Sequence, residues 1–468
     1  MTVKHALDKL PPQAQQALRW VRAAVTPGIL FKRIFSETYE FLQESQRWDS
    51  ERLREYQVRR LGLLLHHAYG NVPYYRRIFD DRGLTPKDIG AVEDLQKLPF
   101  LTRKIIRDNL PDLVARNFPK RKLLYVTTGG TTGTPMGFYF ENVRSAARER
   151  AFMTLQWERV GYRTGDRSVV IRGDVVETAE KGRFWRLDPA SGNLIMPSFH
   201  MTEENLPIYI KKLRQFAPDF IQAFPSAAYV LAQYMHDREE GPFSTLKAVL
   251  CVSESMYDWQ RSIIENTFGC RVYSWYGHSE RAVLAGECEE SAFYHIFPEY
   301  GITEIVDEER NVVLKEGKSG EIIATGFNNF AMPFIRYRTG DRAMREKGPC
   351  RCGRAYPLLT RIEGRVQEYI VAGDGSLIPF GPILFGIHDP GWGRVRAIQF
   401  VQEEKGALFI RVVKDPSCTE REIQRYVRGL FEKRLPGRWD MEVQTVPHIP
   451  RAESGKYRFL VQKISATP

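Results

Sequence analysis

The sequence has no long apolar run, no internal repeat and no low-complexity tract. A membrane-spanning helix needs roughly 20 consecutive apolar residues, and no stretch of the 468 residues reaches that length. The N-terminal residues also lack the charged start, apolar core and small-residue cleavage site that mark a secretory signal. We therefore expect no transmembrane segment and a cytoplasmic location.

Cysteine is scarce, with only six residues in the whole chain. A disulfide framework is typical of short secreted chains, so this number in a long chain without a secretion signal argues against one. Reduced thiols and metal ligands remain as interpretations. We expect Cys251 and Cys270, which lie on apolar segments, to be buried core residues.

The chain also lacks a concentrated basic patch with interleaved aromatic residues, because its 68 lysines and arginines are spread over the full length. That distribution argues against a nucleic-acid-binding protein. The formal net charge of +11 is still compatible with an anionic small-molecule partner. With 43% hydrophobic and 27% charged residues, the composition is globular, and the length predicts two or three packed units.

The first 120 residues read as an irregular helical preamble. Apolar residues at helical spacing over 14–45, with basic residues between them, predict an amphipathic helix. This helix either packs on the main body with its basic face in water or touches a membrane surface peripherally. Prolines interrupt the helical pattern that follows and are expected to end or delay its helices: Pro73, Pro86, Pro99 and Pro111.

Strand and helix patterns alternate after residue 120. Short β-branched runs over 123–126, 168–171, 248–252 and 271–275 predict strands, and residues 146–160 predict a helix. Towards the end, residues 396–413 read as two paired strands and residues 419–433 as a helix. This alternation favours a large layered α/β domain followed by a smaller α+β domain.

One segment is unusually rich in glycine and threonine. Directly after the predicted strand 123–126, the candidate phosphate-binding residues are Thr127, Thr128, Gly129, Gly130, Thr131, Thr132, Gly133 and Thr134. Glycine lets the backbone approach a phosphate, while hydroxyl and amide groups supply donors. The lysine of the Walker spacing is absent, as is the G-x-G-x-x-G pattern. The loop suits a triphosphate, and the alternative is an ordinary surface turn.

Four further motifs follow in a fixed order: Tyr276-Gly277-His278-Ser279-Glu280, Tyr337-Arg338-Thr339-Gly340-Asp341, Arg361-Ile362-Glu363-Gly364-Arg365 and Pro450-Arg451-Ala452-Glu453-Ser454-Gly455-Lys456. With the loop, they resemble the adenylate-forming superfamily of acyl-CoA synthetases, adenylation domains and luciferases. The segments His66-His67-Ala68-Tyr69, Val72-Pro73-Tyr74-Tyr75-Arg76 and Leu98-Pro99-Phe100-Leu101-Thr102 resemble its phenylacetate-CoA ligase branch. That branch includes capsule-biosynthesis adenylation proteins and a deazaflavin-coenzyme adenylyltransferase.

The resemblance implies an α/β fold in which residues 1–363 bind ATP and the acid, and residues 364–468 form a small mobile α+β lid domain. It implies ATP-dependent activation of a carboxylic acid as an acyl-AMP with release of pyrophosphate. The acyl group then passes to coenzyme A, or to an amine or hydroxyl acceptor in polysaccharide or natural-product biosynthesis. Adenylyl transfer to a deazaflavin coenzyme is a further alternative. A homodimer is also compatible with the family.

By the same resemblance, Lys456 is the catalytic lysine, Glu280 coordinates Mg²⁺ and Asp341 accepts the ribose hydroxyls with Arg365 nearby. Tyr276 would stack near adenine. The family's adenine-facing loop corresponds to Ser253, Glu254 and Ser255, and its acid pocket to Phe224, Pro225 and Ser226. The family's hinge falls at Gln367, where aspartate or lysine is usual, so the rotation of the lid is left open.

Four residues form a candidate metal site: Cys288, His295, Cys350 and Cys352. Thiolate and imidazole ligands suit tetrahedral Zn²⁺, and closed four-ligand coordination would be structural rather than catalytic. The spacing is not that of a common zinc finger, so free thiols remain the alternative. A catalytically inactive binding scaffold is a second alternative for the whole chain, and the intact Glu280, Asp341 and Lys456 argue against it.

Overall fold

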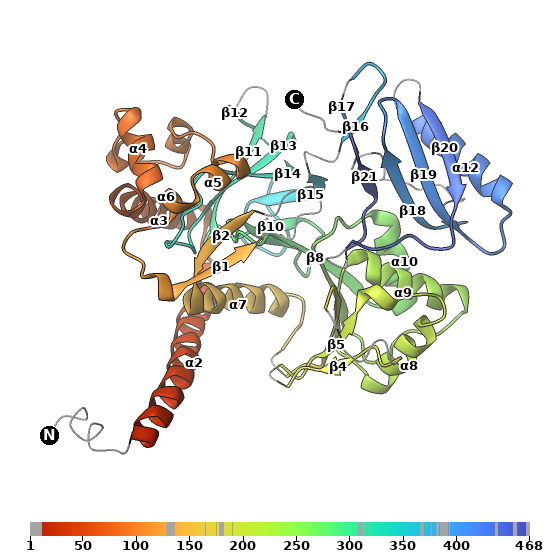
Figure 1. The fold of residues 1–468 in the computed structure, drawn as a ribbon, viewed down its shortest axis with the longest axis horizontal. Coiled ribbons are helices and arrows are strands. Elements are labelled where there is room, and N and C mark those ends of the chain that lie inside the picture. Colours follow the sequence, from red (N-terminus) through yellow and green to blue (C-terminus); the bar gives the residue numbers. More distant parts are fainter. Residues whose placement is uncertain are drawn as a thin grey trace.

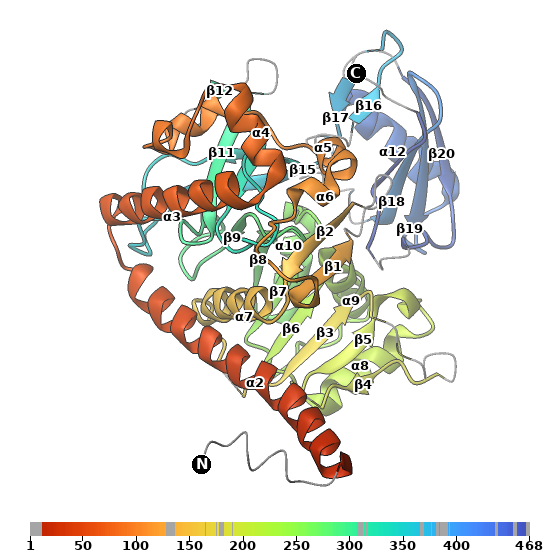
Figure 2. The same cartoon turned by 60° about the vertical axis from the view of Figure 1, so that its left-hand side comes forward.

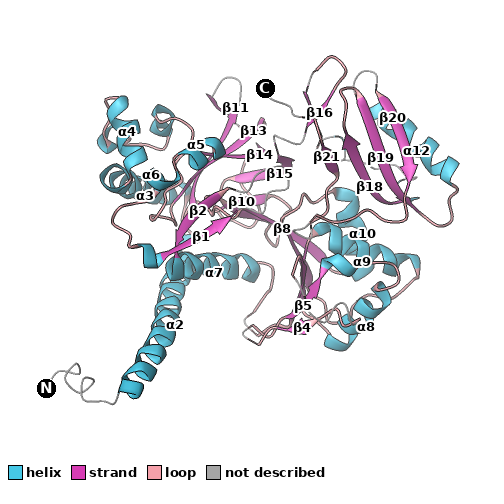
Figure 3. Ribbon diagram, in the orientation of Figure 1, coloured by secondary structure: helices cyan, strands magenta, loops and turns pink. Residues whose placement is uncertain are grey.

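The computed structural model describes residues 12–127, 136–163, 165–174, 176, 182–189, 191–307, 312–314, 316–365, 369–375, 377–380, 383, 392, 394–435, 439–452 and 456–464. For some of these, among them 12–27 and 363–365, only the backbone is described. The described chain is mixed α/β, with one thirteen-stranded sheet and a separate four-stranded sheet (Figure 1, Figure 3). In these ranges no helix is long and apolar enough to cross a membrane.

The N-terminal part is helical, as its sequence pattern predicts. Its helices and 3₁₀ turns are α2 (Pro12–Ser45), α3 (Ser50–Asn71), α4 (Pro73–Asp81), η1 (Pro86–Asp88), η2 (Glu93–Lys97), α5 (Arg103–Asp108), α6 (Leu110–Leu113) and η3 (Lys120–Lys122). Pro73 and Pro86 stand in the first turn of their elements, where the missing amide donor costs nothing. Helix α2 extends away from the body, and its C-terminal part packs beside α7 (Asn142–Glu158) (Figure 2).

The strands of the large sheet come from residues 168–365. Its strands are β3 (Ser168–Arg172), β4 (Arg186–Leu187), β5 (Leu194–Pro197), β6 (Phe220–Ala223), β7 (Ala248–Val252), β8 (Arg271–Gly277), β9 (Leu284–Gly286), β10 (Tyr294–Ile296), β11 (Gly301–Asp307), β12 (Val312–Val313), β13 (Ser319–Gly326), β14 (Tyr337–Arg345) and β15 (Leu358–Arg365). The spatial order is β12-β11-β13-β14-β15-β10-β9-β8-β7-β6-β3-β5-β4. A separate hairpin pairs β1 (Leu123–Thr127) with β2 (Gly137–Glu141).

Parallel and antiparallel strands meet inside this sheet. Strands β5, β3, β6, β7 and β8 run parallel, connected by α8 (Leu206–Phe216), α9 (Pro225–Asp237) and α10 (Asp258–Phe268). From β9 onward the pairing is antiparallel. Parallel strands are covered on both faces, which is why β7 is buried along its whole length. Loops at the carboxyl ends of such strands are where α/β proteins bind ligands.

One buried arginine joins the N-terminal helices to the large sheet. Arg336 is 1% exposed, and its Nε and Nη2 donate to the two carboxylate oxygens of Glu304 at 3.1 and 3.0 Å. Its Nη1 donates to the Leu98 carbonyl at 2.8 Å, and Leu101 pairs with Tyr337 at the start of β14. The segment before α5 is therefore held in place by residues more than 200 positions further along.

The C-terminal part has its own sheet and core. Strands β18 (Val395–Gln402), β19 (Ala407–Lys414), β20 (Asp440–Thr445) and β21 (Leu460–Gln462) lie in the order β20-β19-β18-β21, with α12 (Glu420–Arg434) packed on them. The hairpin β16 (Tyr369–Val371) and β17 (Leu377–Pro379) precedes it. The boundary predicted at 363/364 lies inside β15, and that division into domains stays a prediction.

The C-terminal core extends onto the large domain. Tyr257 and Trp259, at the start of α10, pack in one apolar cluster with Trp392 and Phe459. Arg396 also forms an ion pair with Asp237 at the end of α9. The smaller sheet therefore stands against α9 and α10, next to the carboxyl ends of the parallel strands (Figure 1).

Candidate active site

The first group of predicted site residues gathers where β8 ends and β14 begins. Tyr276 and Gly277 are the last residues of β8, and Glu280 follows in the next turn. The Tyr276 hydroxyl donates to Asp341 Oδ2 at 2.7 Å, and the Tyr337 hydroxyl donates to Glu280 Oε1 at 2.6 Å. Two motifs about 60 positions apart are thereby joined by two hydrogen bonds between their side chains.

Glu280 is a buried, ionised carboxylate. Burial would raise the pKa of Glu280, but the electrostatic attraction of a protonated His278 and the hydrogen bond from Tyr337 outweigh it and lower the pKa to about 2. His278 Nδ1 lies 3.2 Å from Glu280 Oε2. A carboxylate that stays charged in a buried place is suited to a hard cation such as Mg²⁺.

Arg103 belongs to this group, and the sequence analysis did not select it. Its Nε donates to the Tyr337 hydroxyl at 3.3 Å and its Nη2 to the Thr339 carbonyl at 3.4 Å. Arg103 opens α5, which Thr102 caps by accepting from the Ile105 amide. The available signal is its position directly after Leu98–Thr102, the segment that resembles the phenylacetate-CoA ligase branch. We call Arg103, Tyr276, Glu280, Tyr337 and Asp341 the sheet cluster.

The second group joins the large domain to the C-terminal segment. Glu254, in the loop after β7, accepts hydrogen bonds from the Ser226 amide at 3.0 Å, the Ser226 hydroxyl at 3.1 Å and the Tyr457 amide at 2.7 Å. Arg451 Nη1 donates to the Ser226 hydroxyl at 2.7 Å. We call Ser226, Glu254, Arg451 and Tyr457 the bridging cluster.

Local backbone geometry sets up the bridging cluster. Ser253 has φ +71°, a left-handed conformation that is unusual for a residue other than glycine and turns the chain sharply after β7. Phe224 is buried directly before α9, and Pro225 occupies the first turn of that helix. Ser226 is thus presented at the N-terminus of α9, at the carboxyl end of β6. Ser255 lies in the same loop as Ser253 and is half-buried.

The remaining predicted residues are placed as follows. Thr127 ends β1 and pairs with Gly137, whereas Thr128 to Thr134 lie outside the described residues. Arg365 stands opposite Asp341 in the backbone register of β14 and β15. Lys456 is half-buried, and its carbonyl accepts from the Ala452 amide at 3.0 Å. Ser279 is exposed, and Gln367 lies outside the described residues.

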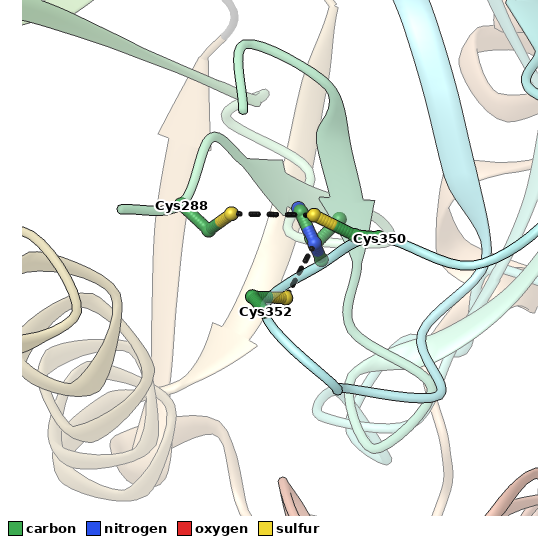
Figure 4. A group of neighbouring side chains, drawn as sticks. Cys288, Cys350 and Cys352 are labelled. Atoms are coloured by element: carbon green, nitrogen blue, oxygen red, sulfur yellow. Dashed lines mark hydrogen bonds between the residues drawn. The ribbon is translucent and has the colours of Figure 1, made fainter. Parts of the chain in front are cut away.

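The four candidate metal ligands do lie together. Their ligand atoms are all within 4.8 Å of one another, with Cys288 Sγ 3.7 Å from Cys350 Sγ and His295 Nε2 3.2 Å from Cys352 Sγ (Figure 4). His295 Nδ1 lies 3.0 Å from the Phe293 carbonyl, so a proton on Nδ1 leaves Nε2 available as a ligand. Cys288 follows β9, His295 lies on β10, and Cys350 and Cys352 lie in the turn between β14 and β15.

Comparison with known proteins agrees with this arrangement. The family model of the CapK C-terminal domain matches residues 389–463. Protein CapK of Staphylococcus aureus is 26% identical over 415 residues, which cover 88% of this chain and 90% of that protein. The phenylacetate-coenzyme A ligase of Thermus thermophilus is 29% identical over 336 residues, 70% of this chain and 74% of that one.

Solved structures give the same fold. A 2-hydroxyisobutyryl-CoA ligase in its postadenylation state, in complex with 2-HIB-AMP, matches with a TM-score of 0.72 at 19% identity, covering 90% of this chain and 93% of that one. The same ligase in its thioesterification state, in complex with 2-HIB-AMP and CoA, matches with a TM-score of 0.60 at 21% identity, covering 89% of this chain and 91% of that one. The fold is that of the adenylate-forming acyl-CoA ligases. The chain is a homologue of CapK and of the phenylacetate-coenzyme A ligases.

Proposed function

We propose that this protein is an AMP-forming acid ligase, which uses ATP to convert a carboxylic acid into an acyl-AMP and releases pyrophosphate. The sheet cluster is the observation that carries the proposal, because it joins the Tyr276–Glu280 and Tyr337–Asp341 motifs in one hydrogen-bonded group. Its place at the carboxyl end of β8 is a ligand-binding position in α/β sheets. Homology to phenylacetate-coenzyme A ligases supports the same reaction.

Each residue has a defined part in this proposal. Asp341 would accept the ribose hydroxyls, Tyr276 would lie against adenine, and Glu280 would hold Mg²⁺, which neutralises phosphate charge during attack by the carboxylate. The loop from Thr127 to Thr134 would contact the β- and γ-phosphates, with Arg365 near the ribose. Lys456 would place its ammonium between the acid and the α-phosphate.

ATP–pyrophosphate exchange tests the proposal directly. The purified chain is assayed with a panel of aryl, fatty, amino and sugar acids, without coenzyme A. We expect one class of acid to stimulate exchange well above the background without acid. Measurable ATP binding with no exchange for any acid would contradict acid activation and would direct attention to adenylyl transfer onto another acceptor, such as a deazaflavin coenzyme.

The acyl acceptor distinguishes two versions of the function. Coenzyme A is the acceptor implied by the phenylacetate-coenzyme A ligases, whose matches cover about 70% of the chain. The match to CapK covers 88%, and the family model of the CapK C-terminal domain lies on β18 to β21. The resemblance to capsule-biosynthesis adenylation proteins makes this second finding compatible with an amine or hydroxyl acceptor, as in polysaccharide assembly. Release of AMP that depends on added coenzyme A would select the first version.

We also propose a structural Zn²⁺ held by Cys288, His295, Cys350 and Cys352. A tetrahedral ion bound at about 2.3 Å places two sulfurs about 3.8 Å apart, close to the 3.7 Å between Cys288 and Cys350. The four ligands would tie the β9–β10 connection to the β14–β15 turn. With all four positions taken by protein, the ion would have no vacancy for substrate.

Metal content tests this site. We expect one zinc per chain by elemental analysis, lost in Cys288→Ser and retained in the control Cys418→Ser, whose thiol lies outside the group. Removing zinc with a chelator should lower the melting temperature by about 10 °C or more, because a structural ion contributes directly to folding. Equal zinc content in both variants would contradict the assignment.

A further inference from the structure

A polar cavity of about 390 Å³ lies outside both the sheet cluster and the bridging cluster. It is partly open to solvent, and three segments distant in sequence line it. Tyr39 and Gln43 come from α2, Glu158 and Arg159 from the end of α7 and the residue after it, and Arg354 from the turn that carries Cys352. Its volume falls in the range of about 300 to 1,000 Å³ that is usual for small-molecule sites.

The cavity has an excess of positive charge. Arg159, Arg163 and Arg354 line it, against the single carboxylate of Glu158. Glu158 Oε2 already accepts from the Tyr39 hydroxyl at 2.5 Å and from Gln43 Nε2 at 3.1 Å. Arg354 pairs with Glu289 at 3.0 Å, whereas Arg159 and Arg163 form no ion pair among the described residues.

Arg159 is the most buried of the three. The residue is 8% exposed, its guanidinium lies over the rings of Phe297 and Tyr356 at 4.3 and 5.0 Å, and its Nε donates to Gln46 Oε1 at 3.4 Å. Within the described chain, its buried Nη1 and Nη2 have no hydrogen-bond partner. Burial lowers the pKa of Arg159 and outweighs the opposing effect of Tyr356 and Glu299, while the like charge of Arg354 acts in the same direction as burial. The buried carboxylate of Glu299 offsets part of this charge, while the two terminal nitrogens stay without a hydrogen-bond acceptor, which is costly for a buried group.

We propose that this cavity binds a small molecule bearing a phosphate or carboxylate group. Arg163, whose side chain is exposed, and Arg354 would contact the oxyanion, since the guanidinium fork matches both groups. Arg159 would contribute positive charge from the wall, partly offset by Glu299, where low dielectric strengthens attraction. Tyr39 and Gln43 offer polar contacts to the rest of the ligand. The site is independent of the ATP reaction proposed above.

The candidate zinc site offers a competing source of negative charge. Three thiolates and one neutral imidazole around Zn²⁺ leave one net negative charge. Arg159 interacts electrostatically with His295, and Arg354 is two residues from Cys352. If the zinc site alone balances these arginines, the cavity needs no anion. The experiment must therefore measure ligand binding and zinc content on the same variants.

The test is calorimetric titration of the full chain with inorganic phosphate and, separately, with acetate, in the presence of saturating ATP and Mg²⁺ to occupy the active site. We expect at least one probe to bind, and the preferred probe identifies the oxyanion. Arg163→Gln should weaken that binding about tenfold, as expected for loss of one charge-assisted contact. The matched control Arg150→Gln, an exposed arginine of α7 outside the cavity, should bind like the wild type.

Three results would overturn the proposal. The first is that neither probe binds with ATP present. The second is that Arg163→Gln binds the preferred probe as tightly as the wild type. The third is that Arg159→Lys, which retains the charge but loses the guanidinium fork, reduces zinc content and leaves probe affinity unchanged. If Arg159→Lys does not fold, the comparison of Arg163→Gln with Arg150→Gln decides alone.

Discussion

The sheet cluster and the bridging cluster differ in what holds them in place. Most members of the sheet cluster stand on, or shortly after, β8 and β14 of one sheet, and hydrogen bonds between their side chains join these two strands, which have β9, β10 and β15 between them. The bridging cluster combines residues at the start of α9 and in the loop after β7 with Arg451 and Tyr457. These two residues lie between β20 and β21 of the four-stranded sheet. The first is therefore organised by the fold of the large domain alone. The second exists only while the C-terminal segment contacts that domain.

This difference indicates how nucleotide binding and acid activation can be tested separately. Nucleotide binding should depend on the sheet cluster, and acid activation should additionally depend on contact with the C-terminal segment, where Lys456 lies next to Tyr457. Substitutions in the sheet cluster should weaken nucleotide binding, whereas substitutions in the bridging cluster should reduce acid activation and leave nucleotide binding unchanged.

The largest expected effect is that of Lys456→Ala. Loss of the positive charge that offsets the reacting carboxylate and phosphate should reduce ATP–pyrophosphate exchange by about 10³-fold or more. The dissociation constant for ATP should stay within about twofold, because the sheet cluster is intact. Exchange assays and calorimetry on the same preparation measure both. An unchanged exchange rate would remove Lys456 from the reaction.

Asp341→Ala should produce the opposite pattern. It removes the acceptor of the Tyr276 hydroxyl and the proposed acceptor of the ribose hydroxyls. Loss of hydrogen bonds to a charged group predicts a roughly 100-fold weaker ATP affinity. Calorimetric titration with ATP is the measurement, and the exposed Asp440→Ala serves as a control. ATP affinity equal to that of the control would show that the sheet cluster is not the nucleotide site.

Glu254→Gln should weaken the bridging cluster with a smaller effect. The amide keeps the shape but loses the charge that accepts from Ser226 and Tyr457, at a cost of about 1 to 2 kcal/mol. Exchange should fall about tenfold while ATP affinity is retained. The Tyr457 amide should also exchange faster with deuterium, since it donates to Glu254. If the exposed control Glu204→Gln gave the same results, the effects could not be assigned to the bridging cluster.

Tyr337→Phe should have the smallest effect of the four. It removes one hydrogen bond to Glu280 and one acceptor of Arg103, while the ring stays packed in the core. We expect a few-fold rise in the Mg²⁺ concentration needed for half-maximal exchange, in line with about 1 kcal/mol for a single hydrogen bond. A titration with Mg²⁺ at saturating ATP and acid measures it. No change in the Mg²⁺ requirement would contradict a role for Tyr337 in positioning Glu280.

Much of the fold follows from local patterns in the sequence. The predicted strand 248–252 coincides with β7, because a fully buried parallel strand is a continuous apolar run. The helix predicted at 419–433 is α12, whose start is fixed by the reciprocal hydrogen bonds of Thr419 and Glu422. Element ends were less accurate: β8 continues to Gly277, and α7 begins at Asn142. The α/β class is confirmed.

The site was only partly predictable, since its contacts join distant segments. The sequence places Glu254 and Ser226 in different subsites, yet the Ser226 hydroxyl donates to Glu254, which also accepts from the amide of Tyr457, 203 residues further along. Arg103 reaches a tyrosine 234 residues away, and no local pattern encodes that distance. The four candidate metal ligands can be grouped from the sequence because cysteines are few, and the structure places their side chains together.

The anchoring of the N-terminal helices by Arg336 has a consequence for biosynthesis. The Leu98 carbonyl meets its arginine partner only after 238 further residues have been made, a delay of roughly 10 to 50 s at ordinary translation rates. During that interval the apolar face of α3, with Leu61, Leu64 and Leu65, has no sheet to cover it. The nascent chain therefore emerges from the ribosome with the apolar face of α3 exposed and prone to aggregation. We expect a chaperone that covers α3 until β14 is complete to raise the yield of folded protein.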